Sequence, residues 1–233
     1  MKHWVPALAA LAFLSLGATA WLALDWAPVA QDSAGGLTQK IFYFHVPSAY
    51  VMYLGVFACV LGSLGYLAQR RPGWDALAQA GGELAVLFSA IVLISGPLWG
   101  RKAWGVFWVW DPRLTTTLLG SLLFVAYLVL RSSAGAGEAE KRFSAALAIL
   151  GAAVMPVIHY SVQLWRGQHP TVITSRGGGL APEMGMTLGV AFAAFTLAAV
   201  VLLVVRASLC LAQARLETAR TDAIALGLLE ESE

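Results

Sequence analysis

The chain has 233 residues, of which 59% are hydrophobic and only 12% are charged, and its formal net charge is +2. Soluble globular proteins carry about 25% charged residues, so this chain has too few charges to cover a surface that faces water. The small net charge and the lack of a basic run or a Gly-rich phosphate loop argue against nucleic acid as a partner. The composition therefore predicts a protein that lies in a lipid bilayer.

Six apolar stretches are about as long as the roughly 20 residues that a helix needs to cross a bilayer. We expect helices, because a backbone exposed to lipid must satisfy its hydrogen bonds within its own segment. The predicted fold class is an all-α, polytopic membrane protein with six transmembrane helices and short external loops. The expected spans are about Val5–Leu24, Val46–Leu67, Gly81–Leu98, Leu114–Leu130, Phe143–Tyr160 and Met184–Val205.

The first stretch admits two interpretations. Lys2 and the small residues Ala18–Ala20 resemble a signal peptide with its cleavage site. The apolar run continues to Leu24, beyond the roughly 7–15 residues of a signal-peptide core, and this length favours a retained helix. Basic residues are somewhat more frequent on the side that holds the N-terminus, so the positive-inside rule places that end in the cytoplasm.

The connections between the spans differ in character. Residues 69–80 and 131–142 are expected to be short polar connections without evident ligand chemistry. The connections near residues 25–45, 99–113 and 161–183 are richer in Trp, His, Pro, Gly and Arg, and the alternation of spans places all three on one membrane face. We expect residues 1–206 to form the membrane domain, and residues 207–233 to form a cytoplasmic tail with a short helix.

The segment Trp104–Arg113, called the Trp segment below, is the densest aromatic run, with Trp104, Phe107, Trp108 and Trp110. Tryptophan at a membrane surface can be an ordinary interfacial belt. It can also form a platform for a flat aromatic ligand, because large rigid rings stack well. A belt would place tryptophans on both faces. Here most of them map to the face of the Trp segment, which favours the platform.

Two charged residues end the Trp segment, and each has two interpretations. Asp111 is either the N-cap of the helix that begins near Pro112 or a residue that holds the loop. Arg113 is either a bilayer anchor or a partner for a carboxylate such as a haem propionate.

Histidines supply the candidate metal ligands. His45 and His169 belong to the face of the Trp segment, whereas His159 lies at the end of the fifth span. Two neutral imidazoles suit the iron of a porphyrin as axial ligands, while zinc usually needs three or four protein ligands. The alternative is that both are polar tips at the interface. The two cysteines, Cys59 and Cys210, form no C-x-x-C-H motif, which argues against covalently attached haem.

Three motifs then carry a resemblance. Trp104–Asp111 followed by Pro112–Thr115 resembles the signature of the tryptophan-rich (WWD) haem-handling superfamily of cytochrome c biogenesis. Lys40–Ala49 resembles the first external loop of one family in it, cytochrome c maturation protein C (CcmC). His159–Trp165, followed by His169, resembles the third external loop of that family. With the length and the six-span layout, the resemblance covers nearly the whole chain.

The resemblance implies a bacterial inner-membrane protein that binds haem b non-covalently and delivers it, with no catalytic residues of its own. It implies periplasmic Trp-rich loops and, as partners, the haem chaperone CcmE, the transporter subunits CcmA and CcmB, and the small protein CcmD. His45 and His169 would be the axial iron ligands. The other implied haem-binding residues are Trp104, Phe107, Trp108, Trp110, Asp111 and Arg113.

The chain departs from the family at Phe107, where tryptophan is common, and phenylalanine keeps the stacking face but lacks the indole donor. Pro112 also replaces a residue that is often small, a change that a helix N-terminus accepts. Two other functions stay open. One is a haem lyase of the same superfamily, whose members usually have more spans. The other is a small-molecule permease whose Trp segment is merely interfacial.

Overall fold

The computed structural model describes residues 3–31, 35–133, 137–169 and 179–228, and within these ranges the chain is mainly helical and contains no strand. Six helices are long and apolar enough to cross a membrane, which confirms the predicted fold class. The elements are α1 (Trp4–Trp21), a π-helical turn (Leu22–Trp26), a 3-10 segment (Gly36–Ile41), α2 (Phe42–Gln69), α3 (Pro72–Trp104), α4 (Pro112–Ser133), α5 (Glu138–Trp165) and α6 (Pro182–Ala225).

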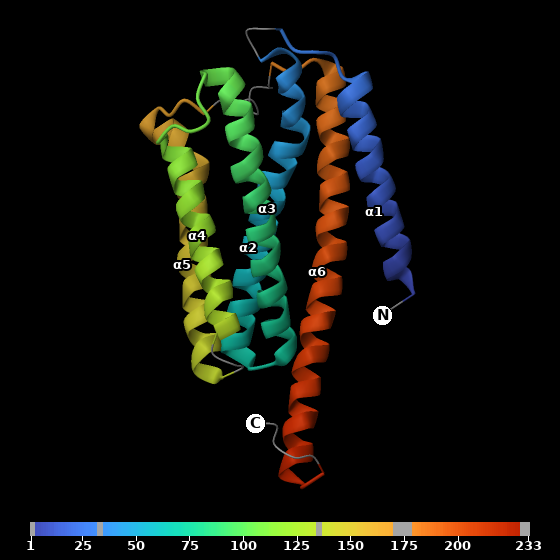
Figure 1. Cartoon of the computed structure of the whole chain (residues 1–233), viewed down its shortest axis with the longest axis vertical. Coiled ribbons are helices and arrows are strands. Elements are labelled where there is room, and N and C mark those ends of the chain that lie inside the picture. The colour runs from blue at the N-terminus through green and yellow to red at the C-terminus, as the bar shows by residue number, and fades with distance from the viewer. Residues whose placement is uncertain (1–2, 32–34, 134–136, 170–178, 229–233) are drawn as a thin grey trace.

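The helices run along the long axis of the molecule, with α2 and α3 in the middle (Figure 1). The α4–α5 pair covers one side of α2 and α3, and α6 covers the other side, where α1 packs mainly on α6. The described parts of the connections 26–41, 105–111 and 166–181 meet at one end, and the end of α2, the start of α3, the end of α4 and the start of α5 lie at the other. The predicted grouping of the three Trp- and His-rich connections at one end is therefore confirmed.

Glycines allow α2 and α3 to approach very closely. A methyl group at Gly62 would lie 2.3 Å from the backbone nitrogen of Ala78, and one at Gly81 would lie 2.3 Å from that of Cys59. In lipid there is little hydrophobic drive to bring helices together, so close backbone packing through small residues supplies much of the attraction. The α2–α3 pair is the centre of the bundle for this reason.

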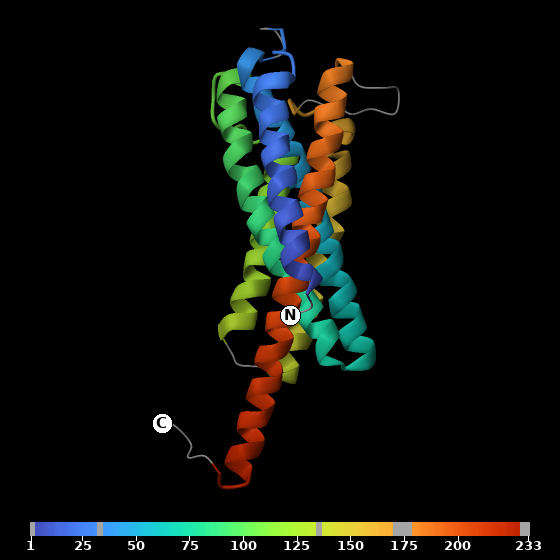
Figure 2. The same cartoon turned by 90° about the vertical axis from the view of Figure 1, so that its right-hand side faces the viewer.

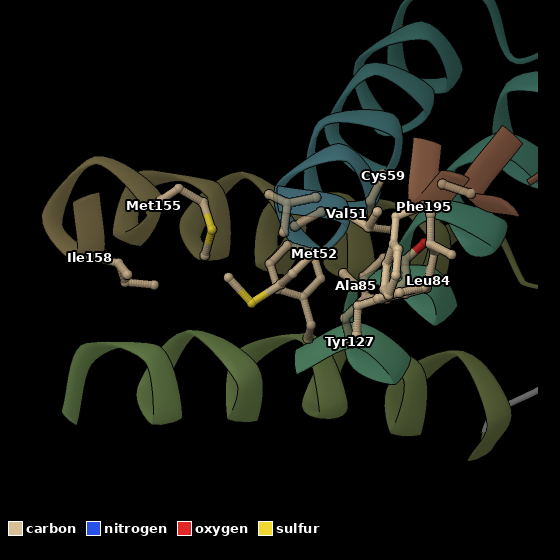
Figure 3. Close-up of a cluster of buried hydrophobic side chains, with 14 residues drawn as sticks. Val51, Met52, Cys59, Leu84, Ala85, Tyr127, Met155, Ile158 and Phe195 are labelled. Carbon is tan, nitrogen blue, oxygen red and sulfur yellow. The ribbon is translucent and has the colours of Figure 1, made fainter. Parts of the chain in front are cut away.

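Apolar side chains from five helices fill the space around this pair (Figure 3). Val51 and Cys59 of α2 are fully buried, and Tyr127 of α4, Ile158 of α5 and Phe195 of α6 pack into the same cluster. Such interiors are packed as densely as organic crystals, so this cluster fixes the five helices relative to one another.

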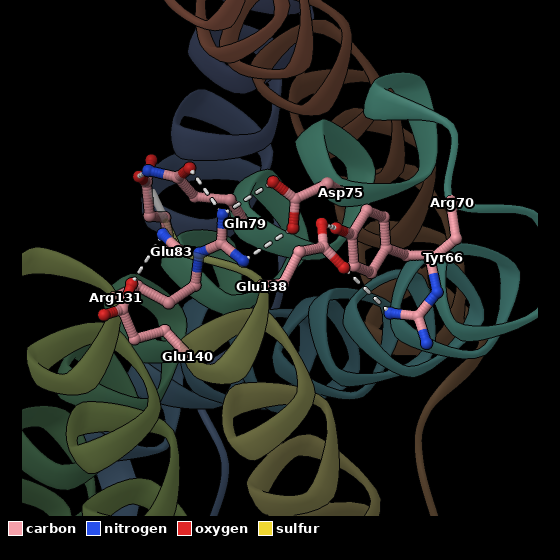
Figure 4. Close-up of polar contacts among 9 residues, drawn as sticks. Tyr66, Arg70, Asp75, Gln79, Glu83, Arg131, Glu138 and Glu140 are labelled. Atoms are coloured by element: carbon pink, nitrogen blue, oxygen red, sulfur yellow. Dashed lines mark hydrogen bonds and ion pairs between the residues drawn. The ribbon is translucent and has the colours of Figure 1, made fainter. Parts of the chain in front are cut away.

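Charged side chains are paired at the end of the bundle opposite the three connections (Figure 4). Arg131 of α4 makes two bonds to Asp75 of α3, at 2.6 and 2.9 Å, and both side chains are mostly buried. Tyr66 of α2, and Arg70 just after the end of α2, bond to Glu138 of α5. For the buried pair, removing either Asp75 or Arg131 would cost about 3–5 kcal/mol, because the remaining charge would be left without compensation.

These pairs explain why the expected connections 69–80 and 131–142 were too long. The first is only two residues, because Arg70 adopts the left-handed conformation and Pro72 starts the next helix. Hydropathy marks the apolar part of a helix, but the backbone continues as a helix where charges find partners. For the same reason α6 continues past Arg206, which pairs with Glu83, as one helix to Ala225 rather than as a separate short helix. Figure 2 shows this extension beyond the bundle.

A matched pair of glycine variants tests the packing of α2 on α3. Gly62→Ala is expected to destabilise the protein by about 1–3 kcal/mol, because its methyl group overpacks against Ala78. Gly189→Ala in α6 is exposed and meets nothing within 4 Å, so the higher helix propensity of alanine should leave stability equal or raise it by up to about 1 kcal/mol. Thermal unfolding of both variants in detergent is the measurement. Equal midpoints would contradict the close approach.

Candidate functional site

A cavity of about 1270 Å³ lies at the end where the three connections meet. Ligand sites are usually about 300–1,000 Å³, so the space is ample for a large flat molecule. It brings together residues that are far apart in the sequence. Its walls include His45, Trp99, Trp104, Trp108, Arg113, His159 and His169.

Five of the eight predicted site residues therefore line the cavity, and three do not. Asp111, near the end of the Trp segment, is buried, with only 5% of its surface exposed. Phe107 and Trp110 are 57% and 76% exposed, and they lie on the outer surface of the same segment. The guanidinium of Arg101 lies 5.7 Å from the ring of Phe107.

The Trp segment is mostly not helical. Helix α3 continues to Trp104, further than the expected end at Leu98, and stops because Gly105 has a φ of 79°. Trp104 and Trp108 therefore do not share a helix face, as a helical segment would require. Trp108 and Trp110 meet edge to face with ring centres 5.7 Å apart. The buried indole N–H of Trp108 has no hydrogen-bond partner among the described residues.

His45 lies inside helix α2, which begins at Phe42, and not in a loop that ends at residue 45. Its Nδ1 atom is 2.8 Å from the hydroxyl oxygen of Ser95 on α3. That hydroxyl donates its only proton to the carbonyl of Ile91 at 2.6 Å. Ser95 must then accept from Nδ1–H of His45, so in the neutral ring the lone pair is on Nε2.

The surroundings of His45 also restrict its ring. The ring meets Trp99 edge to face with centres 5.8 Å apart, and only 7% of the residue is exposed. A methyl group at Gly96 would lie 3.2 Å from Cε1 of His45. Sequence reasoning missed Ser95 and Gly96, although a serine and a glycine within an apolar stretch, shortly before the Trp segment, were a usable signal.

Lys40 joins the end of the first helix to the start of the second. Its buried ammonium group donates to the carbonyl oxygens of Leu24, at 2.5 Å, and Ala27, at 3.2 Å. The π-helical turn of residues 22–26 ends next to these carbonyl groups, which the helix does not use itself. The ammonium group of Lys40 therefore stabilises the connection between the first two helices.

Asp111 makes the bonds that both of its interpretations require, as the N-cap of α4 and as a residue that holds a loop. One carboxylate oxygen accepts from the backbone N–H of Arg113 at 2.8 Å and so caps α4. The other accepts from the backbone N–H of Gln168 at 2.6 Å, in the connection after α5. A side chain at Gly167 would collide with this carboxylate, since a methyl group there would lie 2.2 Å from it.

Arg113 is half-buried, and its side chain bonds to the end of α5. Its guanidinium donates to the carbonyl oxygens of His159, at 2.7 Å, and Ile158, at 3.3 Å. A third N–H is 3.3 Å from Nδ1 of His169. Since arginine is always protonated and only donates, Nδ1 of His169 is the acceptor in this contact.

The candidate metal ligands at this site are histidine side chains. In the parts of the chain that the structure describes, no group of three or more His, Cys, Asp or Glu side chains could hold a metal ion. His159 also lines the cavity, and its ring meets that of Tyr160 edge to face with ring centres 4.9 Å apart. An iron ion that already has four equatorial ligands needs only one or two imidazoles from the protein.

Comparison with known proteins identifies the family of the chain. A family model described as heme exporter protein C matches residues 1–222. Heme exporter protein C of Bradyrhizobium diazoefficiens is 34% identical over 148 residues, which are 64% of this chain and 56% of that protein. The Escherichia coli protein of the same name is 32% identical over 166 residues, covering 70% of this chain and 65% of that protein.

A plant protein is also similar. The putative cytochrome c biosynthesis ccmC-like mitochondrial protein of Marchantia polymorpha is 31% identical over 166 residues, 70% of each chain. The chain spans less than two thirds of the length of the Bradyrhizobium and Escherichia coli relatives. Because the family model extends over almost all of its residues, the chain belongs to the heme exporter protein C (CcmC) family.

Proposed function

We propose that this chain binds haem in the cavity at the end of the bundle and delivers it during cytochrome c biogenesis. The observation that carries the proposal is that one cavity gathers His45 of α2, His169 of the connection after α5, and three tryptophans of α3 and the Trp segment, Trp99, Trp104 and Trp108. The names of the relatives, which call them heme exporters, support the same ligand.

His45 and His169 are the proposed axial ligands. The contact with Ser95 leaves the Nε2 lone pair of His45 for a metal, and the hydrogen bond at Nδ1 orients the ring as metal-bound histidines require. Two imidazoles saturate haem iron, which keeps oxygen away from it during transfer. Since the chain contains no C-x-x-C-H motif, we propose that haem b is held non-covalently.

The aromatic residues have two proposed roles. Trp104 and Trp108 line the cavity and would stack on the macrocycle, and the unpaired buried N–H of Trp108 would donate to an acceptor on it. Phe107 and Trp110 are exposed and would form the outer edge of the site, where an acceptor protein can reach haem. Asp111 joins the start of α4 to the connection after α5.

The proposed setting follows the family. The chain would lie in the bacterial inner membrane with its N-terminus in the cytoplasm and the cavity on the periplasmic side. It would act with CcmA, CcmB and CcmD and pass haem to CcmE. The chain would supply iron ligands and an aromatic platform, and so the proposed role is haem transfer, with any chemical step carried out elsewhere.

Histidine variants test the axial ligands. Purified wild-type protein loaded with haem should show the visible spectrum of low-spin, bis-histidine iron, and His45→Ala or His169→Ala should remove it, because one axial ligand is lost. His3→Ala, at the far end of the chain, is the matched control and should keep the spectrum. Full retention of the bis-histidine spectrum in the His45→Ala, His169→Ala double variant would refute the assignment.

Leucine variants test the aromatic platform. Replacing Trp104 and Trp108 with leucine should reduce haem affinity by about tenfold or more, because each ring contributes about 0.5–1.5 kcal/mol beyond its buried area. Trp110→Leu should leave affinity nearly unchanged but slow transfer to CcmE, since its ring is outside the cavity. Haem titration and transfer to purified CcmE measure the two effects. Unchanged affinity in the Trp104, Trp108 variant would favour an interfacial belt.

Asparagine at position 111 separates the two functions of this carboxylate. Asp111→Asn keeps a good N-cap for α4, so the unfolding midpoint should change little. One acceptor oxygen becomes an NH₂ group, and the bond from Gln168 is lost, so ligation by His169 should weaken. Asp111→Ala removes both bonds and should also lower stability by about 1–2 kcal/mol. Normal bis-histidine haem in both variants would show that the tether is dispensable.

A further inference from the structure

The two proposed axial histidines are prepared differently for a metal. In His45 the Nδ1–H is bonded to Ser95, and the lone pair on Nε2 remains for a ligand. In His169 the Nδ1 lone pair already accepts a hydrogen bond from the guanidinium of Arg113, at 3.3 Å. His45 therefore keeps a lone pair for iron, whereas His169 uses its Nδ1 lone pair in a hydrogen bond from Arg113.

Arg113 and iron cannot both hold His169. A neutral imidazole has one donor nitrogen and one acceptor nitrogen, and arginine only donates. If iron bound Nδ1, it would take the lone pair that Arg113 now uses. If iron bound Nε2, the ring proton would move to Nδ1 and face the N–H groups of the guanidinium. Ligation by His169 by either nitrogen therefore requires Arg113 to leave it.

A carboxylate is the chemical group that can draw Arg113 away. The guanidinium is half-buried and lines the cavity, and its hydrogen bonds to described residues go to neutral acceptors: the carbonyl oxygens of Ile158 and His159, and His169. The nearby Asp111 carboxylate acts on it through charge but accepts no bond from it. Hydrogen bonds between arginine and a carboxylate are about twice as strong as neutral ones and are often made in pairs. A carboxylate in the cavity would therefore compete well for this side chain.

Resting on the proposed function, we propose that Arg113 couples recognition of a propionate to axial ligation by His169. A tetrapyrrole with free carboxylates engages Arg113, which releases His169 for the iron. A tetrapyrrole without them is bound by His45 alone. When the carboxylates withdraw toward an acceptor, Arg113 returns to His169 and the iron loses one ligand, which favours release. Arg113 thus acts as a positioning residue through His169.

Two iron tetrapyrroles test this coupling in the intact wild-type protein. Ferric haem and its dimethyl ester, in which both propionates are blocked, are added separately, and the visible spectrum reports five- or six-coordinate iron. Haem should give the six-coordinate, bis-histidine spectrum. The diester should give a six-coordinate fraction about tenfold lower, because a charge-assisted hydrogen bond is worth at least that factor in an equilibrium.

Variants then locate the effect. Arg113→Met should bring the diester to the six-coordinate spectrum and should slow the release of haem, since the guanidinium no longer competes with iron for His169. Arg101→Met removes an exposed cation that is bonded to Gly105 on the same face and should behave like wild type. The comparison of the two tetrapyrroles in wild type needs no variant, so it stands even if Arg113→Met folds poorly.

The outcomes separate the two proposals. Equal six-coordination of haem and the diester in wild type would overturn the coupling while leaving haem binding intact. Loss of six-coordination with both tetrapyrroles in a folded Arg113→Met protein would also overturn it. No haem spectrum at all in wild type would overturn the proposed function and the coupling with it.

Discussion

The carboxylate of Asp111 is the contact on which the geometry of the cavity depends. It bonds to the first turn of α4 through Arg113 and to the connection after α5 through Gln168, with one oxygen for each. Because α3 ends at Trp104, no helix supports residues 105–111, and this buried acceptor supplies the support. The Trp segment and His169 are thereby held close to each other.

The two ends of the bundle use polar groups in different ways. At the end opposite the three connections, charges pair across helices, as Asp75 does with Arg131, and the helices are joined rigidly. At the other end, Lys40 and Arg113 donate largely to backbone carbonyl groups, and among the described residues neither side chain is hydrogen-bonded to a carboxylate. A cation that is bonded only to neutral acceptors remains available to an anionic ligand, which suits a site for a molecule with propionates.

The close α2–α3 pair links the fold to this site. Gly55 and Gly62 bring α2 against α3, and His45 and Ser95 lie on this same pair of helices, nearer the cavity. Their hydrogen bond at 2.8 Å is possible only if the helices approach and stay in register. The bond then selects which nitrogen of His45 keeps its lone pair. A packing feature of the membrane core thus determines a chemical property of the proposed ligand.

The sequence by itself determined the fold class, because six long apolar runs allow only helices in lipid. It also determined that His45, His169 and the Trp segment share one end, since the alternation of spans decides the end of each connection. It misjudged where helices stop, because Asp75 and Glu138 continue as helix once they find partners on other helices. Only the tertiary structure decided that Ser95 orients His45 and that Arg113 occupies His169. These contacts join residues 50 and 56 positions apart, and no local pattern encodes which donor meets which ring nitrogen.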